Sequence, residues 1–329
     1  MARIASFFAK PFRYTVCFAL VLILFTVYVF LDVFYLEKLY AVMEESPVDF
    51  YDLYSIETTK PNENPVSNSE ENPSAAEQGE EMPYIEPGIR LATYVDDNIE
   101  LTIEQFEGEG GSFFVAEVKL SSVNYLRTAL HKGQLGKNIT APTSEIAEDN
   151  NALFAISGDY AGYNERGVIA RNGQILRVAP REGQYGLVVD IYGDFLMIPE
   201  IELTEEKLRE VNALHCFSLG PTLVVDGEIN ISVSNVSVKR NPRTAIGQKG
   251  PLHYIFIVTN GRSNEIRSGM LFPELAEELL KRGCTMAYNL DGGGTSTIWY
   301  DGEVINTPST NGVDLKERNI SDIVYIPRG

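Results

Sequence analysis

An apolar run near the start of the chain, Tyr14 to Phe34, limits what the remaining residues can fold into. It holds 21 residues, and its single charge is Asp32 near the outer end. At about 1.5 Å per helical residue, the run is long enough to span the roughly 30 Å hydrocarbon core of a bilayer. A continuous run of this kind is typical of a membrane helix, so the folded part should begin after it.

The residues around this run indicate its orientation. Arg3, Lys10 and Arg13 precede it, which places the N-terminus on the cytoplasmic side. No small-residue cleavage site follows, and the long core with its aromatic flank favours an uncleaved anchor over the alternative, a signal peptide. We therefore expect a cytoplasmic tail (1–13) and a single-pass signal anchor in the plasma membrane (14–36), with everything after it extracellular.

Residues 37–83 read as an acidic stalk. Between Glu44 and Glu81 the chain has eleven acidic residues and one basic residue, Lys60, with repeated Asn, Pro and Ser. Such a composition cannot bury enough apolar surface to offset chain entropy, so we expect a disordered, self-repelling segment. The patch VDFYDLYSI (48–56) is a candidate for a short ordered element near the membrane.

The remaining residues, 84–329, are enough for one domain. The composition of the chain excludes several functions for this domain. The formal charge of −19 argues against nucleic acid or anionic lipid as a partner. Beyond Cys17 in the anchor, only Cys216 and Cys284 occur, so a disulfide framework is absent and one bridge is left open. The three histidines lack zinc-site spacing, and no serine-hydrolase or P-loop motif is present. We expect no required cofactor, with a divalent cation left open.

The predicted fold class is α+β, a single domain of mixed or antiparallel sheet with a few packed helices. Apolar, β-branched runs predict many short strands, and Asn-Gly, Gly-Asp and Asp-Gly turns between such runs predict hairpins. Capping residues and apolar spacing predict three helices. The hairpin turns are at 172–173, 193–194, 226–227 and 301–302, and the helices are at 142–150, 204–212 and 273–282.

A loop of three glycines, Gly292, Gly293 and Gly294, follows Asp291 at the end of a buried run. Glycine loses more backbone entropy on folding than any other residue, so three in a row need a reason. One reason is close approach of backbone N–H groups to a ligand, often an anion. The alternative is a bulged turn in which glycine supplies positive φ and Asp291 is a cap. The loop alone leaves both open.

Asp159 and Asp291 are the carboxylates that most resemble a catalytic pair, because each follows a buried run. Cleavage at a sugar carbon needs one group that protonates or orients the leaving oxygen and another that stabilises or attacks the carbon. The alternatives are an Asx-turn for Asp159 and a loop cap for Asp291. Glu165 is a weaker third candidate.

Two arginines and three aromatic residues lie in segments of the same type. Arg243 and Arg318 offer forked donors for a phosphate or carboxylate, although a surface ion pair is an equal alternative for each. Tyr160, Tyr163 and Trp299 have rings that suit a sugar face, with hydrophobic packing as the alternative.

Five segments, in the same order, resemble the phosphodiester glycosidase family. The family includes the uncovering enzyme that removes N-acetylglucosamine from a mannose phosphodiester, and many bacterial exported, exopolysaccharide-related proteins. The resemblance runs from about Thr143 to Ile326 and is strongest at NLDGGGTST. The segments are ISGDYAGYNERGVIARNG (156–173), SLGPTLVVDG (218–227), PRTAIG (242–247), NLDGGGTST (289–297) and VINTPSTNGVDLKERNISDIVYI (304–326).

This resemblance implies a membrane-anchored hydrolase that cleaves a sugar-1-phosphodiester bond, of the N-acetylglucosamine type or in a cell-surface glycopolymer. Asp291 and Asp159 would supply the acid, base or nucleophile. Arg243 and the N–H groups of residues 292–294 would hold the phosphate, with Arg318 assisting. The expected binding set is completed by Ser218, Asn289 and Thr295.

A second class of function retains ligand binding but has no catalytic activity. Ser157 stands where the family usually has asparagine, and Asn260 where aspartate is common. The alternative is therefore a non-catalytic polysaccharide-binding or scaffold ectodomain in cell-envelope or exopolysaccharide biology. Release of free sugar on binding separates the two readings.

Overall fold

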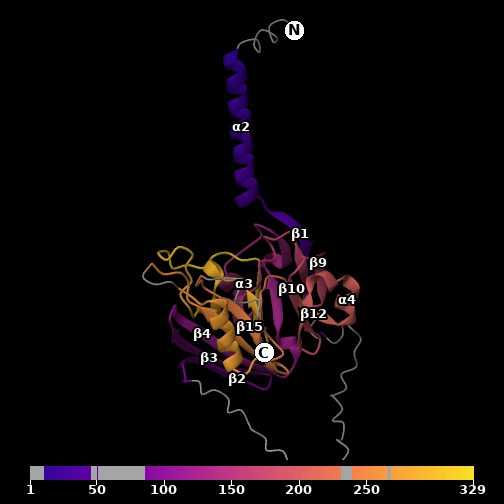
Figure 1. The fold of residues 1–329 in the computed structure, drawn as a ribbon, viewed down its shortest axis with the longest axis vertical. Helices are drawn as coiled ribbons and strands as arrows, with labels where there is room; N and C mark the ends of the chain where they lie inside the picture. Colours follow the sequence, from indigo (N-terminus) through magenta and orange to yellow (C-terminus); the bar gives the residue numbers. More distant parts are fainter. Residues whose placement is uncertain (1–10, 46–49, 51–85, 231–238, 265–267) are drawn as a thin grey trace, which may run out of the picture.

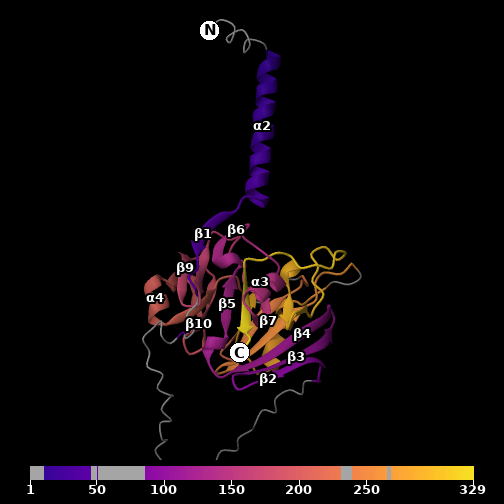
Figure 2. The ribbon, with the colours of Figure 1, turned by 180° about the vertical axis from the view of Figure 1, so that it is seen from behind.

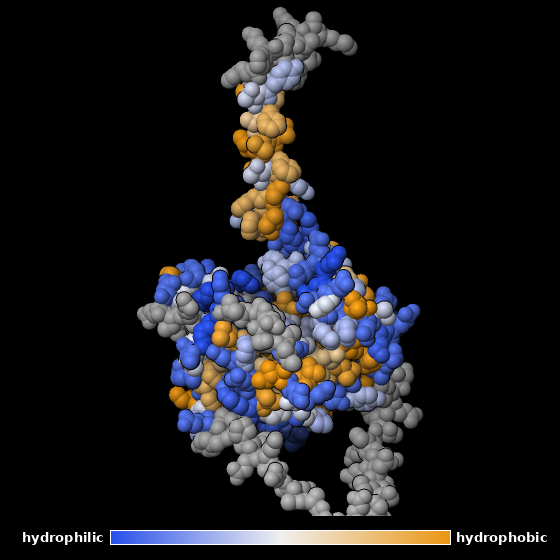
Figure 3. Space-filling model, viewed as in Figure 1, coloured by the Kyte–Doolittle hydropathy of each residue, from blue (hydrophilic) through white to orange (hydrophobic). Residues whose placement is uncertain are grey.

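A computed structural model describes residues 11–45, 50, 86–230, 239–264 and 268–329. Helix α2 (Pro11–Phe34) projects from the rest of the protein as an isolated rod (Figures 1 and 2). Its residues Tyr14–Phe34 are long and apolar enough to cross a membrane, and none of that window is buried. Figure 3 shows this apolar rod above a mostly polar domain.

The domain is built on an eight-stranded sheet. Its strands are β2 (Ile89–Val95), β3 (Ile99–Gly108), β4 (Gly111–Leu120), β13 (Thr222–Val225), β14 (Glu228–Ile229), β15 (Thr244–Gly250), β16 (His253–Thr259) and β17 (Met286–Leu290). They lie in the order β14-β13-β17-β15-β16-β4-β3-β2.

Two five-stranded sheets and one strand pair complete it. The first sheet, β19-β18-β7-β20-β5, contains β5 (Arg127–Leu130), β7 (Ala152–Ser157), β18 (Ile298–Tyr300), β19 (Glu303–Val304) and β20 (Asp322–Pro327). The second, β11-β10-β12-β8-β9, contains β8 (Gly167–Arg171), β9 (Gln174–Ala179), β10 (Tyr185–Asp190), β11 (Phe195–Pro199) and β12 (Ala213–Phe217). The pair is β1 (Lys38–Val42) with β6 (Gln134–Lys137).

Every strand pairing in the described ranges is antiparallel, which confirms the predicted fold class. The four predicted hairpins are present as β8–β9, β10–β11, β13–β14 and β18–β19. Asn172 and Gly173 both have positive φ (48° and 78°), as do Asp301 and Gly302 (49° and 97°). Two successive residues with positive φ match the twist of hairpin strands, and Asn-Gly and Asp-Gly tolerate it best.

The predicted helices are also confirmed. They are α3 (Thr143–Asp149), α4 (Glu205–Glu210) and α6 (Phe272–Lys281), with 3-10 turns η2 (Val123–Tyr125), η3 (His131–Gly133), η4 (Glu200–Glu202) and η5 (Gly293–Thr295). In α6, Pro273 occupies the first turn and Gly283, at φ +83°, lies just past the end. This is the usual placement of both residues. Leu275 and Leu279 form its buried face.

One hydrophobic core joins the three sheets. It contains Phe256 and Tyr288 from the eight-stranded sheet, Phe154 and Val324 from β7 and β20, and Phe217 from β12. The outer faces are covered by helices: α6 packs on β13 and β16, α3 on β7 and β20, and α4 on β12. Just past their ends, β7 and β17 meet, because Asp291 N–H donates to Gly158 O.

The start of the expected stalk is folded rather than disordered. Residues Lys38–Val42 form β1, which pairs with β6 in the register Lys38↔Lys137. The next residues continue the contact: Met43 N–H donates to Gly133 O (2.7 Å), and Glu44 N–H donates to Gln174 Oε1 (2.7 Å). An acidic composition predicted disorder, but β6 offers an open edge on which this short segment completes its backbone hydrogen bonds.

Phe50, in the patch singled out at 48–56, is fully buried. Its ring packs with Val123, Ile191 and Leu214, and the Arg127 guanidinium lies 4.7 Å from the ring centroid. The other residues of that patch, and residues 57–83 of the expected stalk, lie outside the described residues. The cytoplasmic tail does so too, apart from residues 11–13.

Candidate functional site

Four segments in which a buried run ends in polar residues come together at one place: 156–167, 217–223, 241–247 and 289–297. Ser157, the last residue of β7, links two of the others: its hydroxyl lies 2.9 Å from Thr244 Oγ1 and donates to the Asp291 carbonyl at 3.0 Å. Asp291 N–H in turn donates to Gly158 O at 2.8 Å. The fourth segment joins through Ser218, whose N–H donates to Asp159 Oδ2 at 2.9 Å. Ser157, at the position where the family usually has asparagine, therefore connects the segment that contains Thr244 to the loop that follows Asp291.

The glycine loop is packed tightly on its neighbours. A Cβ at Gly292 would lie 2.6 Å from Pro242 O, and one at Gly294 would overlap the Thr310 side chain. Gly293 has φ +71°, and its N–H donates to Pro242 O at 2.8 Å. The glycines therefore serve close packing and a left-handed backbone, as the bulged-turn alternative expected. The Gly293 amide is used inside the protein and is not a free anion donor.

Asp291 lies at the mouth of this loop, with its side chain 13% exposed. The nearest cation is Arg318, whose Nη2 is 3.6 Å from Asp291 Oδ2. Burial raises the pKa of Asp291 to about 6. The charge of Arg318 works against this increase, and the charge of Asp159 adds to it. A carboxyl with such a pKa exchanges protons near neutral pH, as a general acid or base must.

Asp159 has a different environment from Asp291. It is 2% exposed, and its Oδ1 lies 2.9 Å from Nη2 of the fully buried Arg171. The same guanidinium donates to Asp322 Oδ2 through Nε (3.0 Å) and Nη2 (2.9 Å). Burial and the neighbouring Asp159 raise the pKa of Asp322, since one arginine serves two carboxylates in a dry site. Asp159 is therefore a member of a buried ion cluster.

Sequence reasoning did not identify Arg171 or Asp322. The available signal is the position of Arg171, a charged residue at the end of the buried strand VIAR just before the Asn-Gly turn. Asp322 similarly begins the apolar strand DIVYIP. Charges are seldom fully buried without a partner, so a charge inside each run implies a partner elsewhere in the fold.

Ser218 supports the cluster rather than facing a ligand. Its hydroxyl donates to Glu200 Oε1 (2.8 Å) and accepts from Val168 N–H (2.8 Å). Glu200 is fully buried and pairs with Arg181. With its hydroxyl and N–H both used, Ser218 fixes Asp159 in place.

Arg243 points away from Asp291. Its guanidinium stacks on Phe272 of α6, 3.7 Å from the ring centroid, and Nε donates to Met270 O at 3.1 Å. Burial lowers the pKa of Arg243 to about 10, with no opposing contribution from a carboxylate in the described residues. Since Thr244 faces Ser157, the preceding residue faces the opposite side of the sheet. Arg243 and Asp291 are therefore not brought together.

Arg262, which the sequence analysis also missed, is the arginine beside the glycine loop. Its Nη2 lies 3.2 Å from the position of a Gly293 Cβ. Its hydrogen bonds go to uncharged oxygens, Asn241 Oδ1 (3.0 Å) and Thr310 O (2.9 Å). Together with Arg318, whose N–H donates to Gly294 O at 3.3 Å, it puts a second cation next to the loop.

The remaining candidates divide between the site and the core. Tyr160 and Tyr163 stack with ring centroids 4.7 Å apart and planes 12° apart, and Asp291 contributes to raising the pKa of Tyr160, after burial. Trp299 is 3% exposed and packs in the core under α3, so for it hydrophobic packing is the correct reading. Glu165 stays exposed in the loop after Tyr163.

Two polar residues close the floor of the site. Asn289 donates through Nδ2 to Gly220 O (2.8 Å) and Leu290 O (2.9 Å), while its Oδ1 is buried without a hydrogen-bond partner among the described residues. Thr295 Oγ1 donates to Gly292 O at 2.7 Å. Both side chains hold the shape of the loop.

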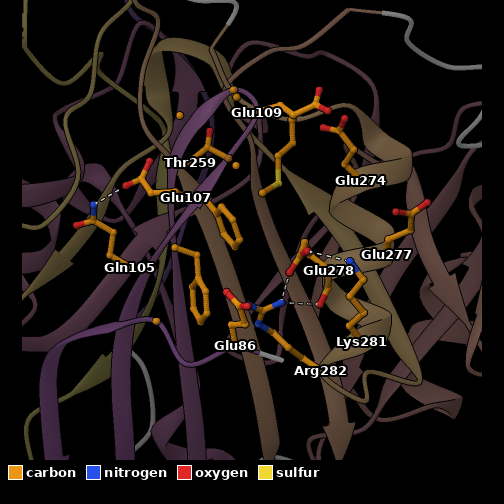
Figure 4. Close-up of a pocket in the computed structure, with 18 of the residues that line it drawn as sticks. Glu86, Gln105, Glu107, Glu109, Thr259, Glu274, Glu277, Glu278, Lys281 and Arg282 are labelled. Carbon is orange, nitrogen blue, oxygen red and sulfur yellow. Dashed lines mark hydrogen bonds and ion pairs between the residues drawn. The ribbon is translucent and has the colours of Figure 1, made fainter. Parts of the chain in front are cut away.

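A cavity of about 630 Å³ lies elsewhere, between the β3–β4 hairpin and α6 (Figure 4). Phe106, Phe113 and Met270 line it, and it has an acidic rim of six glutamates. None of the candidate carboxylates or Arg318 lines it. The glutamates outnumber the three cations that also line the cavity, Arg240, Lys281 and Arg282, which does not suit an anionic substrate. The region around Asp291 is therefore the better candidate. The rim consists of Glu86, Glu107, Glu109, Glu274, Glu277 and Glu278.

One group of possible metal ligands lies on and beside α3. In the described part of the chain, one group of His131, Glu145 and Asp149 has ligand atoms within 4.8 Å of one another. Its two carboxylates are exposed on α3. His215 is fully enclosed, and burial lowers its pKa to about 3, so it stays neutral.

Comparison with protein families gives a match that includes the whole site. The family model for phosphodiester glycosidases (NAGPA) matches residues 150–327, a span that holds every candidate residue from Asp159 to Arg318. Over 129 residues the chain is 32% identical to the SPbeta prophage-derived uncharacterized protein YomE of Bacillus subtilis (strain 168). That match covers 38% of this chain and 19% of YomE, so the chain spans about a fifth of that relative.

Among solved structures, the fold is similar to the catalytic domain of zebrafish N-acetylglucosamine-1-phosphodiester alpha-N-acetylglucosaminidase, auto-inhibited by its pro-peptide. The TM-score is 0.58 at 20% identity, over 74% of this chain and 89% of that one. A hypothetical protein from Synechocystis gives a TM-score of 0.49 at 14% identity, over 70% of this chain and 62% of that one. At this identity the zebrafish match shows a shared fold.

Proposed function

The chain belongs to the phosphodiester glycosidase family, and we propose that it hydrolyses the bond between the anomeric carbon of a sugar and a phosphodiester. Water adds through its oxygen to the anomeric carbon and loses one proton. The bond from that carbon to the phosphate oxygen breaks, its electron pair stays on the oxygen, and the oxygen takes up a proton. The products are the free sugar and a phosphomonoester.

The observation that carries the proposal is the pairing of Asp291 with Arg318 at the mouth of the glycine loop. Asp291, with its pKa raised to about 6, holds a proton in slightly acidic solution and donates it to the leaving phosphate oxygen. Such an acid typically contributes a factor of about 10²–10⁴ to the rate. Raising the pKa of one of two neighbouring carboxyls by burial is an established way to make it the acid.

Arg318 receives the phosphate. Its side chain is 42% exposed and lies 3.6 Å from Asp291, so a phosphate bound to it meets the Asp291 proton. Arg262, beside Gly293, supplies a second positive charge. In a protein with a net charge of −19, local arginines are needed because long-range attraction of an anion is absent.

Asp159 affects the pKa of Asp291 through its charge. Its charge, held by Arg171, raises the pKa of Asp291, which favours the protonated acid that the reaction needs. It is a positioning residue in this proposal, together with Ser218. The stacked rings of Tyr160 and Tyr163, with Tyr163 38% exposed, offer a flat apolar face for the sugar.

The layout supports action at the cell surface. We assign residues 14–36 to an uncleaved signal anchor with a cytoplasmic N-terminus, and the domain to the extracellular side of the plasma membrane. The expected substrates are sugar-1-phosphodiesters of the N-acetylglucosamine type or in cell-surface glycopolymers.

The test uses the full-length protein in detergent or nanodiscs with the methyl phosphodiester of N-acetylglucosamine 1-phosphate. We expect release of free N-acetylglucosamine and a loss of about 10²–10⁴-fold in kcat for Asp291→Asn. The matched control is Asp226→Asn, an exposed residue at a hairpin turn with φ 51°, where asparagine fits equally well. Its activity should be unchanged.

Binding without release of sugar would contradict the proposal and favour the polysaccharide-binding alternative, for which the Tyr160–Tyr163 stack would suffice. Equal activity of wild type and Asp291→Asn would remove Asp291 from the chemistry.

A further inference from the structure

The membrane helix and the domain are joined almost without a spacer. Strand β1 begins at Lys38, four residues after α2 ends at Phe34. Asp32 of the helix pairs with Lys38 (2.8 Å) and with Lys137 of β6 (3.6 Å). Asn138 Nδ2 donates to Leu36 O at 2.8 Å, so the connection is held to the domain before β1 begins.

The same strand pair supports the loop that carries the stacked tyrosines. Ala161 is buried in one cluster with Leu135 of β6, against which Tyr40 and Ala41 of β1 pack. A Cβ at Gly162 would lie 2.7 Å from Gly136 O of β6, so the loop touches β6 directly. The Tyr160–Tyr163 face is thus built on the strands that follow the membrane helix.

These contacts limit the height of the site above the membrane. A fully extended chain covers at most about 3.5 Å per residue, so the segment from Phe34 to Tyr40 reaches no more than about 20 Å. The expected stalk would have lifted the domain well clear of the bilayer. With β1 docked, the loop around Tyr160 instead stays close to the bilayer surface.

The segment that leads to Arg318 exposes two large apolar side chains among its polar ones. Val313 and Leu315 are 67% and 70% exposed, among the most exposed large apolar side chains of the domain. At its other end, the segment contacts the glycine loop through Arg318 N–H and Gly294 O. In Figures 1 and 2, the yellow loops of the C-terminal region lie in the half of the domain nearer to α2.

From this arrangement we propose that the substrate is bound to the membrane, as a sugar phosphodiester whose phosphate is esterified to a lipid alcohol. This rests on the proposed function. The sugar lies on the tyrosine face and the phosphate on Arg318. The lipid chain passes by Val313 and Leu315 toward the bilayer, and hydrolysis leaves a lipid phosphomonoester in the membrane and a free sugar.

The test compares two substrates that share the same reacting bond. One is the methyl phosphodiester of N-acetylglucosamine 1-phosphate in solution, and the other is its hexadecyl phosphodiester in phosphatidylcholine vesicles that hold the full-length protein. Five EAAAK repeats inserted between Phe34 and Tyr35 lengthen the connection by about 38 Å, at about 1.5 Å per helical residue. A flexible Gly-Ser insert of equal length, which still lets the domain reach the bilayer, is the control.

We expect wild type to hydrolyse both esters. The helical insert should lower the rate of hydrolysis of the hexadecyl ester at least about 10-fold and leave the rate for the methyl ester within about twofold. The flexible insert should lower the hexadecyl rate less than the helical insert does. Val313→Ser with Leu315→Ser should also lower only the hexadecyl rate.

The outcomes separate the two claims. If neither the wild type nor any variant releases sugar from either ester, the proposed function is wrong. If the methyl ester is cleaved but the hexadecyl ester is not, or if the helical insert leaves the ratio of the two rates unchanged, the lipid-linked substrate is wrong and the proposed function stands.

Discussion

The Arg318 guanidinium lies 3.6 Å from the Asp291 carboxylate, an exposed cation beside a buried acid. The two side chains come from different segments that meet through the Arg318 N–H and the Gly294 carbonyl. Arg318 partly offsets the effect of burial on Asp291, so the pKa stops at about 6 instead of rising further. An anionic substrate that engages Arg318 removes part of this offset and favours the protonated acid.

Asp291→Asn should make the folded protein more stable at neutral pH. In the unfolded chain the aspartate pKa is about 3.9. The folded protein, with a pKa of about 6, binds a proton that the unfolded chain has lost between these values, so stability falls as pH rises through this window. At pH 8 the wild type carries the full penalty of about 2–3 kcal/mol. Asparagine carries none.

Denaturation of wild type and variant at pH 4 and pH 8 checks this. The difference should be near zero at pH 4 and favour the variant at pH 8. A variant that is less stable at pH 8 would mean that Asp291 mainly caps the glycine loop.

Replacement of Arg318 by glutamine should weaken substrate binding and shift the pH profile. A charge-assisted hydrogen bond contributes about 1.5–3 kcal/mol, so KM for the methyl phosphodiester should rise about 10- to 100-fold. Because Arg318 lowers the pKa of Asp291, its loss should move the descending limb of kcat/KM, near pH 6 in wild type, to higher pH. Arg328→Gln is the control, since that side chain is equally exposed (42%) and pairs with Asp301 away from the site. An unchanged profile with Arg318→Gln would separate Arg318 from Asp291.

Arg171→Met should destabilise the fold strongly. It leaves Asp159 and Asp322 buried side by side without their shared cation. Removing one partner of a buried ion pair typically costs about 3–5 kcal/mol. Arg90→Gln, at an exposed pair with Glu104, should change stability by less than about 0.5 kcal/mol. Similar midpoints of chemical denaturation for the two variants would contradict this account.

Cys216 and Cys284 should stay reduced. Both are free and buried, in separate clusters under α4 and α6. Burial raises the pKa of both thiols, that of Cys284 to about 12, so neither forms the reactive thiolate. Native protein should resist iodoacetamide at both positions, and dithiothreitol should not change the melting temperature. A reductant-dependent melting temperature would show that the two are bridged.

Local signals in the sequence were enough for most of the fold. The turn at Asn172-Gly173 and the Pro273 and Gly283 boundaries of α6 depend on residues next to each other in the chain, and the structure has each as predicted. Strand β1 was not predicted because its partner β6 is remote in sequence. The acidic residues that follow β1 instead indicated disorder for the whole of residues 37–83. Its stability comes from an open sheet edge that no local pattern reveals.

The site was predictable in part for the same reason. The NLDGGGTST segment marks Asp291 by itself, whereas Arg171 and Asp322 are 151 residues apart and each is explained only by the other. From the sequence, the phosphate was assigned to Arg243 with Arg318 assisting, because no local pattern shows on which face of the sheet Arg243 lies. In the structure Thr244 faces Ser157, so the preceding residue, Arg243, lies on the opposite face and stacks on Phe272.

The most direct test of the central claim is the position of bond cleavage. The full-length protein hydrolyses the methyl phosphodiester of N-acetylglucosamine 1-phosphate in water enriched in oxygen-18, and the methyl phosphate product is analysed by mass spectrometry. Our account predicts free N-acetylglucosamine and methyl phosphate without the label, because water attacks the anomeric carbon. Label in the phosphate product, or no release of sugar, would contradict it.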